Sequence, residues 1–436
     1  MNTPTHPERQ ITRLNAKIKT IRAREILSSG ANPTIETIVT LESGITGIAS
    51  VPFGSSAGRY EALTLLDGDP ARYGGHGMLQ ATHNVNNVIA PVIAGTDVFD
   101  QKGIDAQLIA LDETPRRENI GGNSILSVSL ACARAACNAR ALPLYQYIRE
   151  TYTLAGEKPY LPKPMMVVIE GGCHADDSTD LQEYMVGIRA DVNSRDAVRA
   201  GIEIYHTLGK VLKAHGYPMN VGLEGAYAPA GIPSNNEPLI YIQKAIVDAG
   251  YEPMDEVAIA LDPAASEFYS DGSYRLERED RTLSAEQLIR YYEELVREFP
   301  IFSIEDGLGE DDWDSWTLLN ERLGQSVIIV GDDLTTTNVT RLQKAIDLKA
   351  INAILIKPNQ VGTLSETVEA VTLAKKHGLK VIVSHRGGGE TTDTLIIDLA
   401  AAVGADFVKV GPSRGERVVK YNRLMEIDEE VASSSE

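Results

Sequence analysis

Residues 327–357 read VIIVGDDLTTTNVTRLQKAIDLKAINAILIK, and this stretch indicates the fold class. Its first apolar run, VIIV, leads to Asp332 and Asp333, and its second, AILI, ends at Lys357. Between them, residues 339–348 have the spacing of an amphipathic helix. Short continuous apolar runs separated by helices are typical of parallel strands buried on both faces. The stretch therefore predicts a strand, a helix and a second strand of an α/β fold.

The same rhythm continues on both sides of this stretch. Further apolar runs lie at 257–262, 301–306, 381–386 and 407–411, and further helical segments at 285–299, 364–377 and 394–403. Thr363 and Glu366 form a helix-starting capping pattern, and Gly378 is a typical helix stop. At least six units follow one another without a glycine-rich dinucleotide fingerprint. We therefore expect a β/α barrel rather than a doubly wound sheet.

The first part of the chain has a different order of elements. Residues 18–26 and 34–40 read as strands, and the alanine-rich segment 124–141 reads as a helix. This part therefore reads as strands followed by helices, unlike the alternating second part. A chain of 436 residues also exceeds one ordinary domain. We place the join at the segment GEKP, which gives an N-terminal domain over residues 1–155 and a barrel over residues 156–436.

Composition argues against nucleic-acid binding and against a membrane span. The formal charge of −20 disfavours nucleic acid, because the phosphate backbone favours surfaces rich in Lys and Arg. The chain has no apolar run of roughly 18 residues and starts with the polar MNTPTHPERQ, so we expect no membrane span and a cytoplasmic protein. Cys132, Cys137 and Cys173 have no CxxC spacing and read as reduced thiols. A small anionic substrate fits this charge if a metal or a local cluster of cations reverses the field.

Charged residues follow the apolar runs, at the positions where the strands of a β/α barrel meet at one mouth. Asp262, Glu305 and Asp332 each lie at the end of such a run. Three carboxylates facing one point repel one another unless a cation neutralises them, and oxygen ligands of this kind suit Mg²⁺. Alternatively, each acid caps a helix or pairs with a neighbouring base. The metal interpretation is favoured because the acids and a lysine occupy successive strand ends.

Lys357 and Glu224 are the candidates for proton transfer. Lys357 is expected at the metal mouth, where desolvation and nearby cations would favour the neutral amine of a general base. The alternative is a structural bridge to the carboxylates. Glu224 lies in the glycine-flanked segment NVGLEG, where the backbone can approach a ligand, and it is the candidate acid. An ordinary glutamate of a surface loop is the alternative there.

Motifs along nearly the whole chain resemble those of the enolase family. NPTIE at residues 32–36 is similar to the family's NPTVE, and GGCHA at 171–175 and QEYM at 182–185 are similar to GGSHA and QEFM. Further matching segments follow in the family's order: DPAASE at 262–267, SIED at 303–306, GDDLT at 331–335, KPNQ at 357–360, SHR at 384–386, and Lys409 with Glu416 and Arg417. So many ordered matches are not expected by chance.

The resemblance implies an enolase-type β/α barrel with an N-terminal α+β lid domain, lyase-type chemistry with two Mg²⁺ during turnover, and a homodimer. It makes Asp262, Glu305 and Asp332 ligands of the first Mg²⁺, and Ser56 the lid serine that reaches the second. The implied catalytic residues are Lys357 as base, Glu224 as acid, and Glu183 and His174 in support. The implied substrate contacts are Gln182, His385, Gly387, Lys409 beside the carboxylate, and Arg386 beside the phosphoryl group.

The sequence departs from the family pattern mainly around the lid and the phosphate end. The lid loop at 53–58 reads FGSSAG instead of SGASTG, Leu223 replaces the Asp before the acid, and Glu170 replaces the Asn before the GGSH motif. After Arg386 the chain reads GGGE, residues 387–390, one residue longer than the family's SGE. These changes spare the implied metal ligands, base and acid. The pattern indicates retained enolisation with a changed entering or leaving group.

We therefore expect a magnesium-dependent enzyme that acts on a small phospho- or phosphono-carboxylate, of the phosphoglycerate or phosphoenolpyruvate type, through an enolate. Among enolase-like paralogues the pattern resembles the carboxyphosphonoenolpyruvate synthases of phosphinate natural-product pathways, and the triple glycine would make room for an extra carboxylate. The alternative is dehydration of 2-phosphoglycerate to phosphoenolpyruvate. A non-catalytic scaffold is a third interpretation, which the retained Glu224 and Lys357 disfavour.

Overall fold

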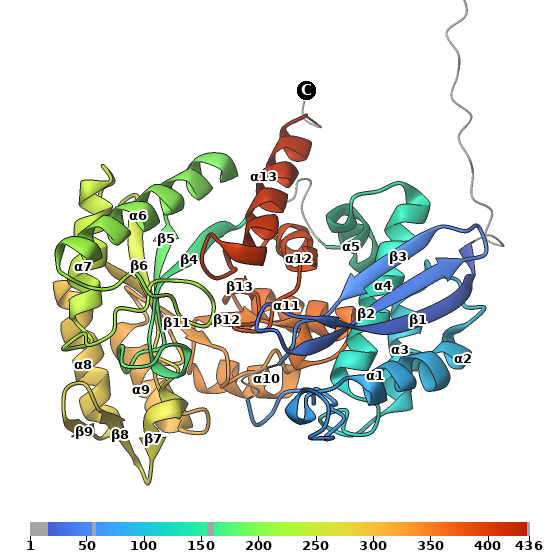
Figure 1. The fold of residues 1–436 in the computed structure, drawn as a ribbon, viewed down its shortest axis with the longest axis horizontal. Coiled ribbons are helices and arrows are strands. Elements are labelled where there is room, and N and C mark those ends of the chain that lie inside the picture. Colours follow the sequence, from blue (N-terminus) through green and yellow to red (C-terminus); the bar gives the residue numbers. More distant parts are fainter. Residues whose placement is uncertain (1–15, 55–57, 155–160, 434–436) are drawn as a thin grey trace, which may run out of the picture.

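The computed structural model describes residues 16–54, 58–154 and 161–433 (Figure 1). It contains a three-stranded antiparallel sheet with its helices, followed by a closed barrel of eight strands. The expected α+β part and β/α barrel are thus both confirmed. The expected boundary between residues 155 and 156 lies outside the described residues.

The N-terminal sheet is an antiparallel meander. β1 (Ile18–Leu27) pairs with β2 (Pro33–Leu41), and β2 pairs with β3 (Thr46–Ser50). Helix α4 (Gly122–Arg140) packs across β2 and β3. It approaches β3 so closely that a Cβ on Gly47 would lie 2.1 Å from a backbone nitrogen of α4. This contact explains a glycine inside a strand, which sequence patterns count against strand formation.

The other helices of this part contact α4 or the edge strand β1 (Figure 1). They are α1 (Leu79–His83), a π-helical turn (Asn84–Ile89), α2 (Ala90–Ile93), α3 (Gln101–Leu111) and α5 (Leu144–Tyr152).

No single helix among the described residues is long and apolar enough to span a membrane. Helices α4 and α5 pass that test only as a pair bent by 102°.

The barrel strands follow the order β10-β11-β12-β13-β14-β4-β5-β6 around the closed sheet. Their bounds are β4 (Lys163–Glu170), β5 (Glu183–Ile188), β6 (Val257–Asp262), β10 (Ile301–Glu305), β11 (Ile328–Gly331), β12 (Ala353–Ile356), β13 (Lys380–Ser384) and β14 (Phe407–Lys409). Neighbours pair in parallel except β5, which is antiparallel to both β4 and β6. The reversal brings the start of β5 to the mouth where the other strands end.

Helices cover the outside of the barrel (Figure 1). They are α6 (Ser194–Ala214), α7 (Glu237–Asp248), α8 (Ala285–Glu298), α9 (Trp313–Leu323), α10 (Val339–Leu348), α11 (Leu364–Lys376), α12 (Leu395–Val403) and α13 (Val418–Ser433). A small sheet of β7 (Tyr269–Ser270), β8 (Ser273–Leu276) and β9 (Arg281–Leu283) follows β6. The expected start of α11 is confirmed, because the Thr363 hydroxyl accepts a hydrogen bond from the backbone N–H of Glu366.

Alternation along the strands decides which side chains reach the mouth. On β6, Ala258 and Ala260 lie in the core inside the barrel, and Asp262 continues their side of the strand. The same alternation leads from Leu355 to Lys357 at the end of β12. The other such pairs are Val330 and Asp332 at β11, Phe407 and Lys409 on β14, and Met185 and Glu183 on the reversed β5. An apolar plug inside the barrel therefore ends in a layer of charged residues.

Candidate active site

A pocket of about 180 Å³ lies at the carboxyl ends of the barrel strands. Most residues expected from the sequence line it: His174, Gln182, Glu183, Glu224, Asp262, Asp332, Lys357, His385, Gly387 and Lys409. Gly58 and Arg59 of the N-terminal part also line it, so both parts of the chain form the site. The expected lid serine, Ser56, lies outside the described residues.

Glu305 and Arg386 were also expected here, but they do not line the pocket. Glu305 is 1% exposed and lies 2.8 Å from the ammonium group of Lys409. Arg386 is 2% exposed, and its guanidinium pairs at 2.6 Å with Glu61 of the N-terminal part. The side chain of Arg386 is therefore engaged with the N-terminal part of the chain. Glu61 was not identified from the sequence, because it lies 325 residues from its partner.

Asp262, Glu305 and Asp332 come from three neighbouring strand ends, those of β6, β10 and β11. Burial raises the pKa of Glu305 well above its usual value, the charge of Asp262 raises it further, and Lys409 partly offsets both. One oxygen of Glu305, Oε2, has no hydrogen-bond partner among the described residues. A buried carboxylate with an unpartnered oxygen favours a cation beside it. The all-oxygen donor set fits Mg²⁺.

Lys409 contacts several of these acids. Its ammonium group lies 2.8 Å from both Asp262 and Glu305 and 2.9 Å from Glu183. Burial alone would lower the pKa of Lys409, but these carboxylates raise it well above its usual value. One buried ammonium group faces three acidic side chains, so a further cation is needed if all three are to be ionised.

Lys357 is paired with Asp332. Its ammonium group contacts Oδ2 of Asp332, and the side-chain amide of Gln360 donates to Oδ1 at 2.7 Å. Burial, the largest single effect, lowers the pKa of Lys357, but the charges of Asp332 and Glu305 raise it, and the net shift is above the usual value. Desolvation and the nearby cations Arg386 and Lys409 therefore act as expected, in favour of the neutral amine, but the acidic neighbours oppose them and prevail in this arrangement. The contact with Asp332 matches the structural bridge that was the alternative.

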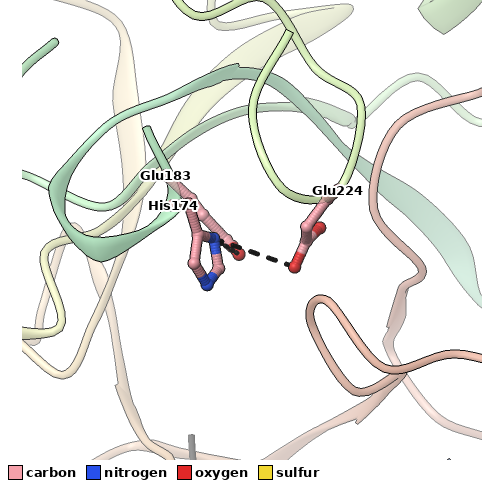
Figure 2. A group of neighbouring side chains, drawn as sticks. All are labelled: His174, Glu183 and Glu224. Carbon is pink, nitrogen blue, oxygen red and sulfur yellow. Dashed lines mark ion pairs between the residues drawn. The ribbon is translucent and has the colours of Figure 1, made fainter. Parts of the chain in front are cut away.

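Glu224 lies beside His174 and Glu183 (Figure 2). His174 Nδ1 is 3.5 Å from Glu183 and 3.9 Å from Glu224, and His385 Nε2 is 3.4 Å from the other oxygen of Glu224. Neither oxygen of Glu224 accepts a hydrogen bond from a described residue. Burial raises the pKa of Glu224 well above its usual value, and the charge of Glu183 adds to the effect. The surroundings of Glu224 thus favour the protonated form, which is the form a general acid needs.

The barrel sets Lys357 and the Glu183–Glu224 group on opposite sides of the pocket. Lys357 follows β12, and Glu183 begins β5, four positions away in a ring of eight strands. The three acids on β6, β10 and β11 lie between them along the ring. A ligand in the pocket would thus meet an amine on one side and a carboxyl group on the other.

Asp306 was quoted in a sequence motif without a role, and the structure gives it one. Its carboxylate accepts the backbone N–H groups of Asp332 at 3.0 Å and Asp333 at 2.8 Å. This contact holds the turn that presents Asp332 to the pocket. Carboxylate oxygens of Asp306, Asp332 and Asp333 lie within 4.8 Å of one another, so these residues form a second acidic group at the mouth. Asp306 and Asp333 directly follow the expected ligands Glu305 and Asp332 in the sequence, and this adjacency was the signal that could have identified them.

The triple glycine contributes one residue to the pocket. Of the three, Gly387 lines it, and a Cβ there would lie 2.3 Å from Oε1 of Glu224. Gly389 instead packs on Phe53 of the lid loop. The carbonyl of Gly389 accepts the N–H of Phe53 at 2.8 Å, and a Cβ on Gly389 would lie 2.0 Å from the Phe53 carbonyl oxygen. Any extra room for a substrate is therefore limited to position 387.

Two family models match the chain. Residues 18–148 match the model described as "Enolase, N-terminal domain", and residues 158–436 match "Enolase, C-terminal TIM barrel domain". The two matches follow the division between the three-stranded sheet and the barrel, and together they span both parts of the site.

Proposed function

Since the chain belongs to the enolase family, we propose that it is a magnesium-dependent enzyme that acts on a phosphoglycerate- or phosphoenolpyruvate-type substrate through an enolate. One observation carries this proposal. Lys357 and Glu224 reach the same pocket from opposite sides, with a row of three carboxylates between them. That arrangement suits removal of a proton from one face of a substrate and protonation of a departing group on the other.

We assign Asp262, Glu305 and Asp332 as the ligands of Mg²⁺, because they supply buried oxygen donors in excess of the local positive charge. Bound Mg²⁺ would stabilise the negative charge of the enolate. An Asp332 that shares its charge with a cation holds the proton of Lys357 less strongly. Lys357 could then accept the proton next to the substrate carboxylate. The assignment of Ser56 to a second Mg²⁺ rests on the family resemblance alone.

Glu224 is assigned as the acid, with His174 and Glu183 orienting it. Its raised pKa and its unpartnered oxygens support this role. We assign Lys409 to the substrate carboxylate, and Gln182, His385 and Gly387 to the substrate. Arg386 is assigned to the phosphoryl group, a role that requires it to exchange or share its contact with Glu61. A homodimer remains a proposal from the family.

We propose further that the enzyme is a specialised paralogue of the carboxyphosphonoenolpyruvate synthase type, which handles an enolpyruvate unit and joins it to a phosphonoformyl group. The support is the position of the departures: Gly387 lies at the acid, and Phe53 packs on Gly389 in the lid contact. The second candidate is dehydration of 2-phosphoglycerate to phosphoenolpyruvate. It is favoured by the presence of the base, the acid and all three metal acids at the mouth.

Ultraviolet detection of phosphoenolpyruvate formed from 2-phosphoglycerate, with Mg²⁺ and with a chelator, separates these candidates. Rapid turnover that the chelator abolishes would support the dehydratase. Intact Mg²⁺ binding with little or no turnover would support the paralogue, and phosphonoformyl donors would be tested next with an enolpyruvate substrate. Failure to bind Mg²⁺ would contradict both.

A further inference from the structure

Glu170, at the end of β4, lies directly under the loop that carries Glu224. The side chain of Glu170 is fully buried. Its Oε2 accepts the backbone N–H of Glu224 at 2.9 Å, and its Oε1 accepts the backbone N–H of Ala226 at 2.6 Å. Both oxygens of one carboxylate therefore hold the backbone on either side of Gly225. Buried N–H groups require such partners.

The loop is shaped to receive this carboxylate. A Cβ on Gly222 would lie 2.3 Å from Oε2 of Glu170, so glycine is required for the contact. The carbonyl of Gly222 accepts the N–H of Gly225, whose φ of +103° favours glycine. The carbonyl of Glu224 accepts from Arg417 at 3.1 Å. The backbone of residue 224 is thus fixed through both its N–H and its C=O.

The carboxyl group of Glu224 itself forms no hydrogen bond with a described residue. Its place in the pocket therefore depends on how its backbone is held as well as on the neighbouring side chains of His174 and His385. We propose that Glu170 is a positioning residue, which fixes the loop of residues 222–226 so that Glu224 faces the substrate. This inference rests on the proposed role of Glu224 as the acid, and it adds a requirement that the family resemblance does not supply, since the family has Asn at this position.

The chemistry of the contact explains why a carboxylate is needed in this chain. Two oxygens can accept two N–H groups, whereas an amide of the same length offers one oxygen and one NH₂ group. In Glu170→Gln one backbone N–H would face a donor and lose its partner. Leaving a buried N–H unsatisfied is unfavourable, so the loop would move.

Hydrogen–deuterium exchange of the backbone tests the geometry without any substrate. We expect Glu170→Gln to speed exchange in the peptide containing Glu224 and Ala226 at least about tenfold. The control is Asp112→Asn, because both oxygens of Asp112 also accept backbone N–H groups of a loop: Oδ2 accepts those of Asn119 and Ile120 at 2.8 Å, and Oδ1 that of Thr114 at 3.2 Å. That variant should change exchange only in its own loop. Unchanged exchange at 222–226 in Glu170→Gln would overturn the proposal.

A second variant approaches the same contact from the other side. Gly222→Ala leaves Glu170 intact but places a methyl group 2.3 Å from Oε2 of Glu170, too close for the present contact. If Glu170→Gln does not fold, this variant provides the test, and the same faster exchange is expected. Normal exchange at Glu224 and Ala226 in a folded Gly222→Ala chain would also overturn the proposal.

The catalytic consequence is tested in D₂O with 2-phosphoglycerate and Mg²⁺. Product formation needs the acid, whereas deuterium incorporation at the α-carbon needs the base, so the two rates can separate. We expect Glu170→Gln to lower product formation on the order of 10²-fold while deuterium incorporation changes less than about threefold. Asp112→Asn should leave the ratio of the two rates unchanged. An equal fall of both rates in Glu170→Gln would show a structural role only and overturn the positioning role.

Glu224→Gln distinguishes failure of this inference from failure of the proposed function. Loss of product formation in Glu224→Gln but not in Glu170→Gln would overturn only the role of Glu170. Unaltered turnover in Glu224→Gln would remove Glu224 as the acid, and the proposed mechanism with it. If the wild-type chain does not act on 2-phosphoglycerate, the exchange of the loop amides still decides whether Glu170 holds the loop.

Discussion

Gly387 lies directly against the carboxyl group of Glu224, so closely that a Cβ at residue 387 would stand 2.3 Å from Oε1. The loop after β13 and the loop that carries the acid are thus in contact. In the sequence they are separate departures from the family pattern, more than 160 residues apart. A change in one loop therefore constrains the other, and both face the part of the substrate that must differ if the reaction differs.

Gly387→Ala is expected to displace Glu224 and lower turnover by on the order of 10²-fold, because small displacements of catalytic groups have effects of this size. Mg²⁺ binding should be unchanged, since the metal acids lie on other strands. Steady-state kinetics and calorimetric titration of Mg²⁺ check the two statements. The control is Gly309→Ala, whose Cβ would make only ordinary contacts of 3.5 Å. Full activity in Gly387→Ala would refute a tight contact at this position.

Glu305→Gln is expected to abolish or greatly weaken Mg²⁺ binding while the fold is retained. The substitution removes a charge that burial already disfavours, but it also removes an oxygen ligand. In the wild-type chain, Mg²⁺ at 100 times its Kd should add about 2.7 kcal/mol to the free energy of unfolding. Thermal unfolding with Mg²⁺ and with a chelator measures this shift. Asp248→Asn, on an exposed helix face, is the control, and an undiminished shift in Glu305→Gln would exclude Glu305 as a ligand.

Asp105 gives the fold a predictable dependence on pH. Burial raises its pKa from 3.8 to about 6, although hydrogen bonds from Ser365 and Ser129 oppose the shift. A folded pKa above the unfolded one means that its contribution to stability is present below about pH 4 and is lost as the pH rises through about 6. The loss amounts to roughly 3 kcal/mol for a shift of about two units.

Asp105→Asn should remove this dependence. Urea unfolding at several values between pH 4 and 7 would then show a smaller loss of stability with rising pH in the variant than in the wild-type chain. Parallel curves for the two proteins would contradict the raised pKa. The Asn side chain keeps one oxygen that can accept the backbone N–H of Ser365, which joins α3 to the start of α11.

Much of the barrel could be predicted from the sequence, because the apolar runs of β6 and of β10 to β14 alternate with amphipathic helices. β4 and β5 were missed because no helix separates them and β5 is antiparallel to its neighbours. β3 was missed because it is short and contains Gly47, which is needed for the approach of α4. Strand-and-helix periodicity identifies repeating units, but it does not reveal a hairpin at the start of a barrel.

The residues at the mouth were predicted better than their contacts. Strand ends place Lys357 and Asp332 in one layer, but sequence alone does not show that they form an ion pair, which opposes the effect of burial on the pKa of the lysine. The pairing of Arg386 with Glu61 depends on how the N-terminal part of the chain packs on the barrel. Such contacts join distant segments, so neither spacing nor composition predicts them.

The central claim is that Lys357 removes the proton next to the substrate carboxylate with the help of Mg²⁺. Nuclear magnetic resonance can follow deuterium incorporation at the α-carbon of 2-phosphoglycerate in D₂O, for the wild-type chain and for Lys357→Ala, with Lys244→Ala as an exposed-lysine control. We predict incorporation that requires Mg²⁺ in the wild type and in the control, and none in Lys357→Ala. Incorporation at the wild-type rate in Lys357→Ala, or incorporation that persists in the presence of a chelator, would contradict the account.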